Sequence, residues 1–250
     1  MRIALISDIH GNLTALDAVL NHIQQSGGVG SFVFVGDYVA IGPEPVEVFE
    51  RLCELENAVF IRGNTDRYTF TGDRPRPTFE EAGQDEKSKL AFIEIQNSFA
   101  WTQGAVATSG CLDWLSALPL DYRLTFADGS TALCVHARPG HDDGPGIDER
   151  SSPDFLSEVA RESKADYLFV GHTHEAVEFV ANGTQIWNLG SVSNPPTSDL
   201  RASYLMIESS SDQTKVVRHR VNYDVDCAIK LVRLRYHPAA AFIEQKLLGK

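Results

Sequence analysis

The feature that most constrains the fold is the regular alternation of short apolar segments with amphipathic ones early in the chain. Residues 3–6, 31–36 and 58–61 have the apolar character of buried strands. Between them, residues 12–25 place leucine and isoleucine on one helical stripe, and prolines open a second helix over 43–55. This alternation is typical of βαβ units, so we expect a largely parallel sheet that is covered by helices.

The rest of the chain departs from this alternation. Residues 68–85 are rich in proline, glycine and charge and are expected to be irregular, followed by helices over 86–106 and 109–117. Further strands are expected near 121–126, 130–136, 166–170, 176–181, 184–188, 203–208 and 214–221, and helices near 153–161, 225–234 and 238–248. The last four strands follow one another without helices between them, which predicts an antiparallel or mixed second sheet. We expect a single domain over 1–250, with a helical insertion over 68–118 near the active site and C-terminal helices over 222–250.

Composition excludes several classes of protein. With 250 residues, 43% of them hydrophobic and 22% charged, the chain is ordinary in composition and is not expected to be disordered. No apolar run approaches the roughly 18 residues that a membrane-spanning helix needs, so no membrane association is expected. The net charge of −12 argues against duplex nucleic acid as a partner, because only the segment 215–250 carries a basic excess.

Cysteine usage indicates a cellular compartment. The four cysteines lie far apart and form no CxxC pair, which is typical of thiols in a reducing environment rather than of a disulfide framework. We therefore expect a cytoplasmic protein. The sequence leaves its oligomeric state open.

Five short polar clusters follow predicted strands, and they carry the chemistry. They are Asp8-Ile9-His10, Gly36-Asp37, Gly63-Asn64-Thr65-Asp66, Val135-His136 and Gly171-His172-Thr173-His174. In an α/β sheet, residues just past the carboxyl ends of parallel strands converge on one crevice. Seven Asp, His and Asn ligands are too many for one zinc ion, but they suit two divalent ions about 4 Å apart that share a carboxylate and a water. Such a centre is used to displace groups at phosphorus.

Each cluster alone has a simpler explanation. A Gly-Asp pair after a strand is commonly only a turn, and a single histidine at a strand end is more often a core residue than a ligand. The joint pattern favours the metal site, because four of the eight histidines lie in these clusters, each at a predicted strand end.

The ordered motifs SDIHGN (7–12), GDYVAIGP (36–43), GNTD (63–66), VHA (135–137) and GHTHE (171–175) together resemble the calcineurin-like metallophosphoesterase family. The segment NLGSVSNPP (188–196) resembles a loop of its small bacterial phosphodiesterase branch. The resemblance implies a four-layer α/β/β/α sandwich, in which two mixed β-sheets pack face to face and are flanked by helices. It also implies a ligand set in which Asp8, His10 and His174 hold one ion, Asn64, His136 and His172 hold the other, and Asp37 bridges them. Manganese is the expected metal, with iron, zinc and nickel as alternatives.

The reaction that the resemblance implies is hydrolysis of a small phosphoester, a nucleotide among the candidates, by in-line attack of a hydroxide that bridges the two ions. Many members of the family have a histidine where this chain has Thr65, and that histidine contacts the phosphate or protonates the leaving group. That role is worth roughly 10²–10⁴ in rate. The small phosphodiesterase branch also lacks this histidine, so phosphodiesters with good leaving groups are the expected substrates.

Three residues are candidates for catalytic roles beyond metal binding. Asn64 is expected to contact the phosphate through its amide, and Asp66 either orients a ligand or caps the next turn. His141, in the loop 138–150, is a candidate substitute acid, although a histidine beside two aspartates is more often a solvated surface residue. Candidates for a phosphate contact, unless they are salt-bridged or solvated, are Arg62, Arg67 and Arg138.

Two other classes of function remain open. Within enzymes, the chain could be a phosphomonoesterase, a protein phosphatase or a dinucleoside-polyphosphate hydrolase of the same family. Outside enzymes, the same fold serves as a non-catalytic scaffold, as in a retromer subunit that resembles this family. Damaged ligand sets usually accompany the scaffold role, whereas all seven ligand positions are intact in this chain.

Overall fold

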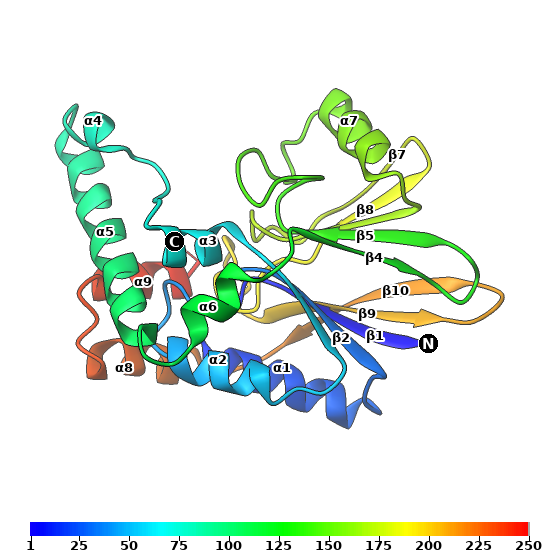
Figure 1. Ribbon diagram of the computed structural model, residues 1–250, viewed down its shortest axis with the longest axis horizontal. Helices are drawn as coiled ribbons and strands as arrows, with labels where there is room; N and C mark the ends of the chain where they lie inside the picture. Colours follow the sequence, from blue (N-terminus) through cyan, green and yellow to red (C-terminus); the bar gives the residue numbers. More distant parts are fainter. Residues whose placement is uncertain (250) are drawn as a thin grey trace.

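Two mixed five-stranded β-sheets form the centre of the computed structural model, which describes residues 1–249 (Figure 1). The first sheet has the strand order β10 (Thr214–Val221), β9 (Ala202–Ser209), β1 (Arg2–Ile6), β2 (Ser31–Val35) and β3 (Ala58–Ile61). The second has the order β4 (Asp121–Thr125), β5 (Thr131–Val135), β6 (Tyr167–Val170), β8 (Thr184–Asn188) and β7 (Glu178–Ala181). Strands β1, β2 and β3 run parallel to one another, as do β5, β6 and β8. In the first sheet, β9 is antiparallel to β1 and to β10. In the second sheet, the outer strands β4 and β7 are antiparallel to their neighbours.

Successive side chains of a central strand point to opposite faces of its sheet, so they contribute to different layers of the fold. In β1, Ile3 and Leu5 face the second sheet, where they join a cluster with Cys134 and Phe169. The intervening Ala4 and Ile6 face the opposite way and pack against the first helices. The two sheets therefore lie face to face, with helices on their outer faces, which confirms the predicted four-layer sandwich.

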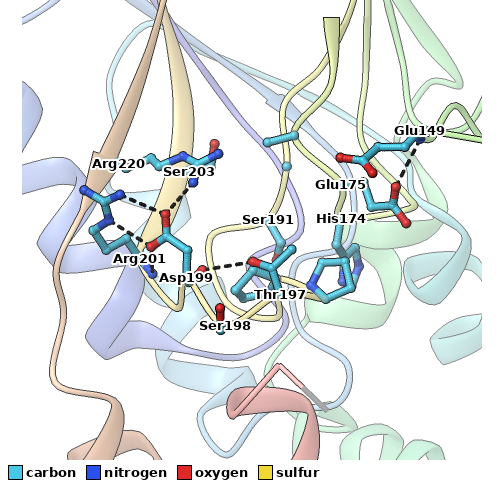
Figure 2. A pocket seen from close by; sticks show the side chains of 14 residues that line it. Glu149, His174, Glu175, Ser191, Thr197, Ser198, Asp199, Arg201, Ser203 and Arg220 are labelled. Atoms are coloured by element: carbon cyan, nitrogen blue, oxygen red, sulfur yellow. Dashed lines mark hydrogen bonds and ion pairs between the residues drawn. The ribbon is translucent and has the colours of Figure 1, made fainter.

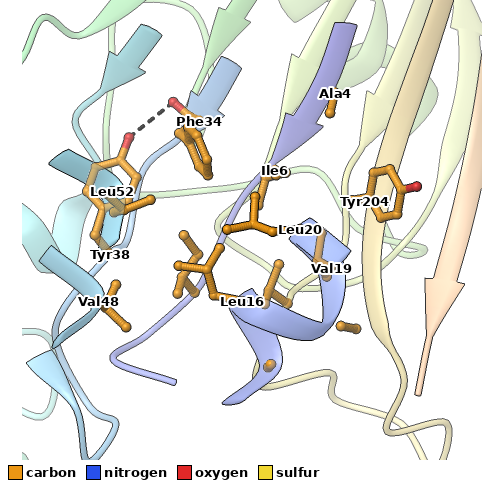
Figure 3. Packing of buried hydrophobic residues seen from close by; sticks show 14 of the residues in the cluster. Ala4, Ile6, Leu16, Val19, Leu20, Phe34, Tyr38, Val48, Leu52 and Tyr204 are labelled. Atoms are coloured by element: carbon orange, nitrogen blue, oxygen red, sulfur yellow. Dashed lines mark hydrogen bonds between the residues drawn. The ribbon is translucent and has the colours of Figure 1, made fainter. Parts of the chain in front are cut away.

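The helices are α1 (Leu13–Gln25), α2 (Pro45–Cys53), α3 (Asn64–Thr71), α4 (Phe79–Ala82), α5 (Glu86–Val106), α6 (Cys111–Ser116), α7 (Pro153–Ser163), α8 (Val225–Leu234) and α9 (Ala240–Leu247). Helix α1 begins where the Asn12 side chain accepts a hydrogen bond from the Ala15 amide, at 3.0 Å. Its apolar stripe, which includes Leu16 and Leu20, packs against Ile6 and Phe34 of the first sheet (Figure 3). Within residues 1–249, none of the helices combines the length and apolar character that a membrane crossing requires.

Two local predictions differ from the structure. Residues 68–85 were expected to be irregular, but α3 runs on to Thr71 and α4 forms a further turn. Helix α3 is stable here because Asp66 accepts the Gly63 amide and Gly72 ends the helix in a left-handed conformation. The second sheet is mixed, as expected, but only β7 and β8 of the last four strands belong to it. Strands β9 and β10 instead extend the first sheet beside β1.

Helices α3, α5 and α9 lie together at one end of the two sheets (Figure 1). In Figure 1 the N-terminus of β1 lies at the opposite end, so α3, α5 and α9 lie toward the carboxyl ends of the parallel strands. Helix α5 packs on α3 through the rings of Tyr68 and Phe99, whose centroids are 5.7 Å apart. These three helices are therefore at the same end of the sandwich as the polar clusters that follow the parallel strands (Figure 1).

A buried histidine joins the C-terminal helices to α5. His237, between α8 and α9, is 4% exposed, and its ring centroid is 4.3 Å from that of Trp101. Its Nδ1 accepts a hydrogen bond from the Ala239 amide at 3.2 Å, whereas its Nε2 is buried without a partner among residues 1–249. Burial lowers the pKa of His237 to about 4, because the charged imidazolium would lose its hydration.

This burial predicts a pH dependence of stability. Between the pKa of about 4 in the folded state and the ordinary value of 6.5, the unfolded chain binds a proton that the folded chain does not, so stability falls as pH decreases through that window. The measurement compares the free energy of unfolding in urea at pH 7 and pH 5. On going to pH 5, the wild type should lose about 1–2 kcal/mol more of this free energy than His237→Asn, which keeps the hydrogen-bond acceptor but does not titrate. An equal loss in both proteins would contradict the assignment.

Candidate metal centre

Seven polar side chains gather at the carboxyl ends of five strands. Asp8 and His10 follow β1, Asp37 follows β2, Asn64 follows β3, His136 follows β5, and His172 and His174 follow β6. The structure brings all seven of the ligands predicted from the sequence together, in two groups that meet at Asp37.

The first group contains Asp8, His10, Asp37 and His174. One ligand atom of each lies within 4.8 Å of those of the other three. The Nε2 atom of His174 is 3.2 Å from Asp8 Oδ1 and 3.0 Å from His10 Nε2, and His10 Nε2 is 3.6 Å from Asp37 Oδ2. Two carboxylates and two imidazoles at this separation could hold a divalent ion.

The second group lies on the other side of Asp37. Asp37 Oδ1 is 3.4 Å from His136 Nε2. The amide oxygen of Asn64 is 3.0 Å from His136 Nε2 and 3.0 Å from His172 Nδ1. The Asp37 carboxylate, which is 2% exposed, therefore turns one oxygen toward each group.

Backbone carbonyl groups orient three of the histidine rings. His136 Nδ1 is 2.7 Å from the Val35 oxygen, and His174 Nδ1 is 2.8 Å from the Asn194 oxygen. His172 is turned the other way, with Nε2 3.0 Å from the Gly144 oxygen. Because a carbonyl oxygen only accepts, each of these nitrogens donates a proton, and the opposite nitrogen of each ring faces the cluster.

The inner atoms of the cluster fit a metal ion. Asp8 Oδ1 is fully buried and has no hydrogen-bond donor among residues 1–249, a costly arrangement for a carboxylate oxygen. Burial alone would lower the pKa of His136, but the Asp37 carboxylate outweighs burial and raises it to about 10. The carboxylates thus attract positive charge strongly, and a metal ion that binds must displace protons from the rings. Mixed nitrogen and oxygen ligands are compatible with manganese, iron or zinc.

The backbone at these positions is held in an unusual conformation. Asp8, His10, Asp37, His172 and His174 all have φ between 48° and 70°, in the left-handed region that non-glycine residues seldom adopt. Each such residue costs about 1–3 kcal/mol. The loops after β1 and β2 hold each other in this conformation, because the Asp8 amide donates to the Gly36 oxygen at 3.1 Å and the His10 amide donates to the Asp37 oxygen at 3.0 Å.

Asp66 has both carboxylate oxygens occupied by the backbone. Its Oδ2 accepts from the amides of Asp37 and Gly63, at 2.8 and 2.9 Å, and its Oδ1 accepts from the Tyr38 amide at 2.9 Å. Burial, together with the charge of Asp37, raises the pKa of Asp66 to about 7. Asp66 therefore caps α3 and positions the loop of the candidate ligand Asp37, and its assignment as a catalytic residue stays a prediction.

The other catalytic candidates lie in or against the 138–150 loop. His141 is exposed in a tight turn, and its side chain makes no hydrogen bond within residues 1–249, so its role as an acid stays a prediction. Arg62 and Arg67 both donate to Asp142, at 2.8 and 3.1 Å, and are therefore salt-bridged rather than free for phosphate. A salt bridge was one of the outcomes expected for both arginines, but its partner was not predicted, because Asp142 reads as a solvated loop residue although it is 6% exposed.

Two cavities adjoin His174. One, of about 350 Å³, is lined by Glu175, Asp199 and Arg220 among others (Figure 2). The other, of about 440 Å³, contains His172 as well as His174, and its walls include Ile41 and Lys246. Pro195 and Pro196 line both cavities, so the two cavities share a wall.

The chain is similar in sequence and fold to several known proteins. The model of the calcineurin-like phosphoesterase superfamily domain matches residues 1–212. An uncharacterized protein of Methanocaldococcus jannaschii is 31% identical over an alignment of 249 residues, and the alignment covers 93% of each chain. The crystal structure of a metallophosphoesterase from Sphaerobacter thermophilus is similar, with 25% identity, a TM-score of 0.74, and coverage of 100% of this chain and 98% of the other. A hypothetical protein of Pyrococcus horikoshii shares the fold, with 18% identity, a TM-score of 0.81 and the same coverage.

The close approach of Gly63 to Asp37 generates a prediction about metal affinity. A Cβ atom at residue 63 would lie 2.0 Å from Asp37 Oδ1, so Gly63→Ala must displace the carboxylate that faces both groups. We expect the affinity for Mn²⁺, measured by calorimetry, to fall by about tenfold to 100-fold. Gly104→Ala in α5 is the matched control, because its Cβ meets no atom within 4 Å. A folded Gly63→Ala protein that binds Mn²⁺ as tightly as the wild type would contradict this role of Asp37.

Proposed function

Because the chain belongs to the calcineurin-like phosphoesterase superfamily, we propose that it hydrolyses phosphodiesters at a centre of two divalent metal ions. The observation that carries this proposal is the position of Asp37, whose two carboxylate oxygens face two separate groups of ligands. A single-ion site would not need a buried carboxylate between two such groups. A two-ion centre uses it as the bridge.

In this proposal Asp8, His10 and His174 hold one ion, and Asn64, His136 and His172 hold the other, with Asp37 shared between them. Manganese is the proposed metal. When bound, such ions lower the pKa of a coordinated water to near neutrality and offset negative charge on the phosphate.

Other groups of the protein hold the ligand side chains in the orientations that this reaction needs. The carbonyl groups of Val35, Gly144 and Asn194 fix the planes of three ligand rings, and Asp66 fixes the loop that carries Asp37. The Asn64 amide group, whose oxygen lies 3.0 Å from His136 Nε2 in the second ligand group, would donate a hydrogen bond from its nitrogen to a phosphate oxygen. Rigid placement of these groups before substrate binds avoids a reorganisation cost during the reaction.

Two observations support a diester rather than a monoester. Residue 65 is a threonine, so no imidazole at this position protonates a poor leaving group. Thr65 is 6% exposed, and its buried hydroxyl has no hydrogen-bond partner within residues 1–249. In addition, the two cavities beside His174 offer separate space for the two organic arms of a diester. The proposed substrate is a small phosphodiester with a good leaving group. All four cysteines are free thiols, which supports the proposal of a cytoplasmic location.

The proposal predicts a preference that can be measured on metal-stripped protein repleted with Mn²⁺. We expect bis-p-nitrophenyl phosphate to be hydrolysed faster than p-nitrophenyl phosphate. Asp37→Asn should reduce the rate by about 100-fold or more, because it removes a negative charge shared by both ions. Asp212→Asn, at an exposed position in the β9–β10 turn, is the matched control and should keep the wild-type rate.

Other results would favour the rival functions. Faster hydrolysis of the monoester would indicate a phosphomonoesterase or protein phosphatase of the same family. Metal binding without turnover of either ester would contradict the enzyme proposal and favour a scaffold on the same fold.

A further inference from the structure

The C-terminal helices lie outside the matched family domain, yet they contact the loop that carries Asp37. The family model ends at residue 212, before α8 and α9. Ile243 and Leu247 of α9 form a buried cluster with Val232 of α8, and Ile41 packs against this cluster. Ile41 follows Asp37 by four residues and has φ 82°, which is strained for a β-branched residue. Contact with α8 and α9 therefore helps to hold the Asp37 loop in place.

The end of α9 is fixed to the segment between the two cavities. Gly249 has φ 66°, and a Cβ atom there would lie 2.0 Å from the Thr197 oxygen, so this contact requires glycine. The Gly249 amide donates to the Lys246 oxygen at 3.1 Å, which places Lys246 one turn before this contact. Lys246 is exposed and lines the cavity that contains His172 and His174. Its Nζ lies 5.5 Å from the centre of the Phe242 ring one turn earlier, and it forms no ion pair within residues 1–249, so its charge is available to an anion.

The two cavities differ in charge. Among the described residues that line the 440 Å³ cavity, Lys246 is the one charged side chain apart from the histidines. The 350 Å³ cavity has three carboxylates, on Glu149, Glu175 and Asp199, against the two guanidinium groups of Arg201 and Arg220 (Figure 2). Both arginines already donate to Asp199. An anionic substrate group is therefore favoured in the cavity that Lys246 lines.

We propose that Lys246 binds a second anionic group of the substrate, so that the site selects nucleotides with a phosphate in addition to the one that reacts. This inference rests on the proposed phosphodiesterase function. Ile41, Pro195 and Pro196 supply apolar walls between Lys246 and the ligand histidines, which suit a nucleoside. The reacting phosphate lies at the metal centre, and the nucleoside spans the cavity toward the ammonium group.

Calorimetry on the full-length, Mn²⁺-loaded protein tests this assignment with adenosine 5′-monophosphate and adenosine 3′,5′-bisphosphate. The wild type should bind the bisphosphate more tightly. Lys246→Gln should reduce this preference by about threefold to fivefold and leave the affinity for the monophosphate unchanged, as expected for one partly solvated ion pair. Lys230→Gln, an exposed lysine of α8 that lines none of the cavities described above, should behave as the wild type.

Gly249→Ala gives an independent test, because it displaces the end of α9 without removing the charge. It should also reduce the preference for the bisphosphate. An unchanged preference in Lys246→Gln, or its loss in Arg220→Gln alone, would overturn the assignment. Hydrolysis of bis-p-nitrophenyl phosphate by the same preparations separates the two proposals. If hydrolysis is absent but the Lys246-dependent preference is present, the proposed reaction is wrong and the assignment of Lys246 stands.

Discussion

The buried carboxylate of Asp37 is the constraint on which the rest of the site depends. It lies between two groups of ligands, with one oxygen near His10 and the other near His136. A buried carboxylate is costly unless charge or hydrogen bonds compensate it. Here the Thr65 amide donates to Oδ1 at 3.0 Å, and the remaining compensation comes from the imidazoles or from the metal ions that they would hold. The strained loops after β1 and β2 and the Asp66 carboxylate hold this charge in position.

The sequence predicted the parts of the site that depend on local pattern. The apolar strands and the polar residues at their ends predicted that Asp8, Asn64 and His136 lie close together, because the carboxyl ends of parallel strands meet at one edge of a sheet. Asp8 and Asn64 follow strands of the first sheet and His136 follows a strand of the second, so the face-to-face packing of the sheets is also required. Pairings between strands that are distant in the chain could not be predicted from the sequence. The pairing of β9 with β1 and the burial of Asp142 beneath Arg62 depend on tertiary contacts that leave no local signal. The left-handed backbone conformation of His172 and His174 could not be predicted either, since histidine does not require it.

The surroundings of the centre account for the substrate class that we propose. The matched family domain contributes all seven candidate ligands, whereas the cavity beside them is completed by α9, which lies beyond that domain. Ile41 connects the two, because it follows Asp37 in the chain and packs against α8 and α9. The same helices that hold the Asp37 loop thus also place a lysine beside the ligand histidines. In our proposal, the matched family domain therefore carries the reaction, and the C-terminal helices select the substrate.

We propose that two metal ions bind on either side of Asp37. Anomalous X-ray diffraction from crystals soaked in Mn²⁺ tests this proposal, because the manganese signal locates each ion without reference to activity. We expect two peaks about 4 Å apart, one among Asp8, His10 and His174 and one among Asn64, His136 and His172. A single peak, or two peaks that do not share Asp37, would contradict the account.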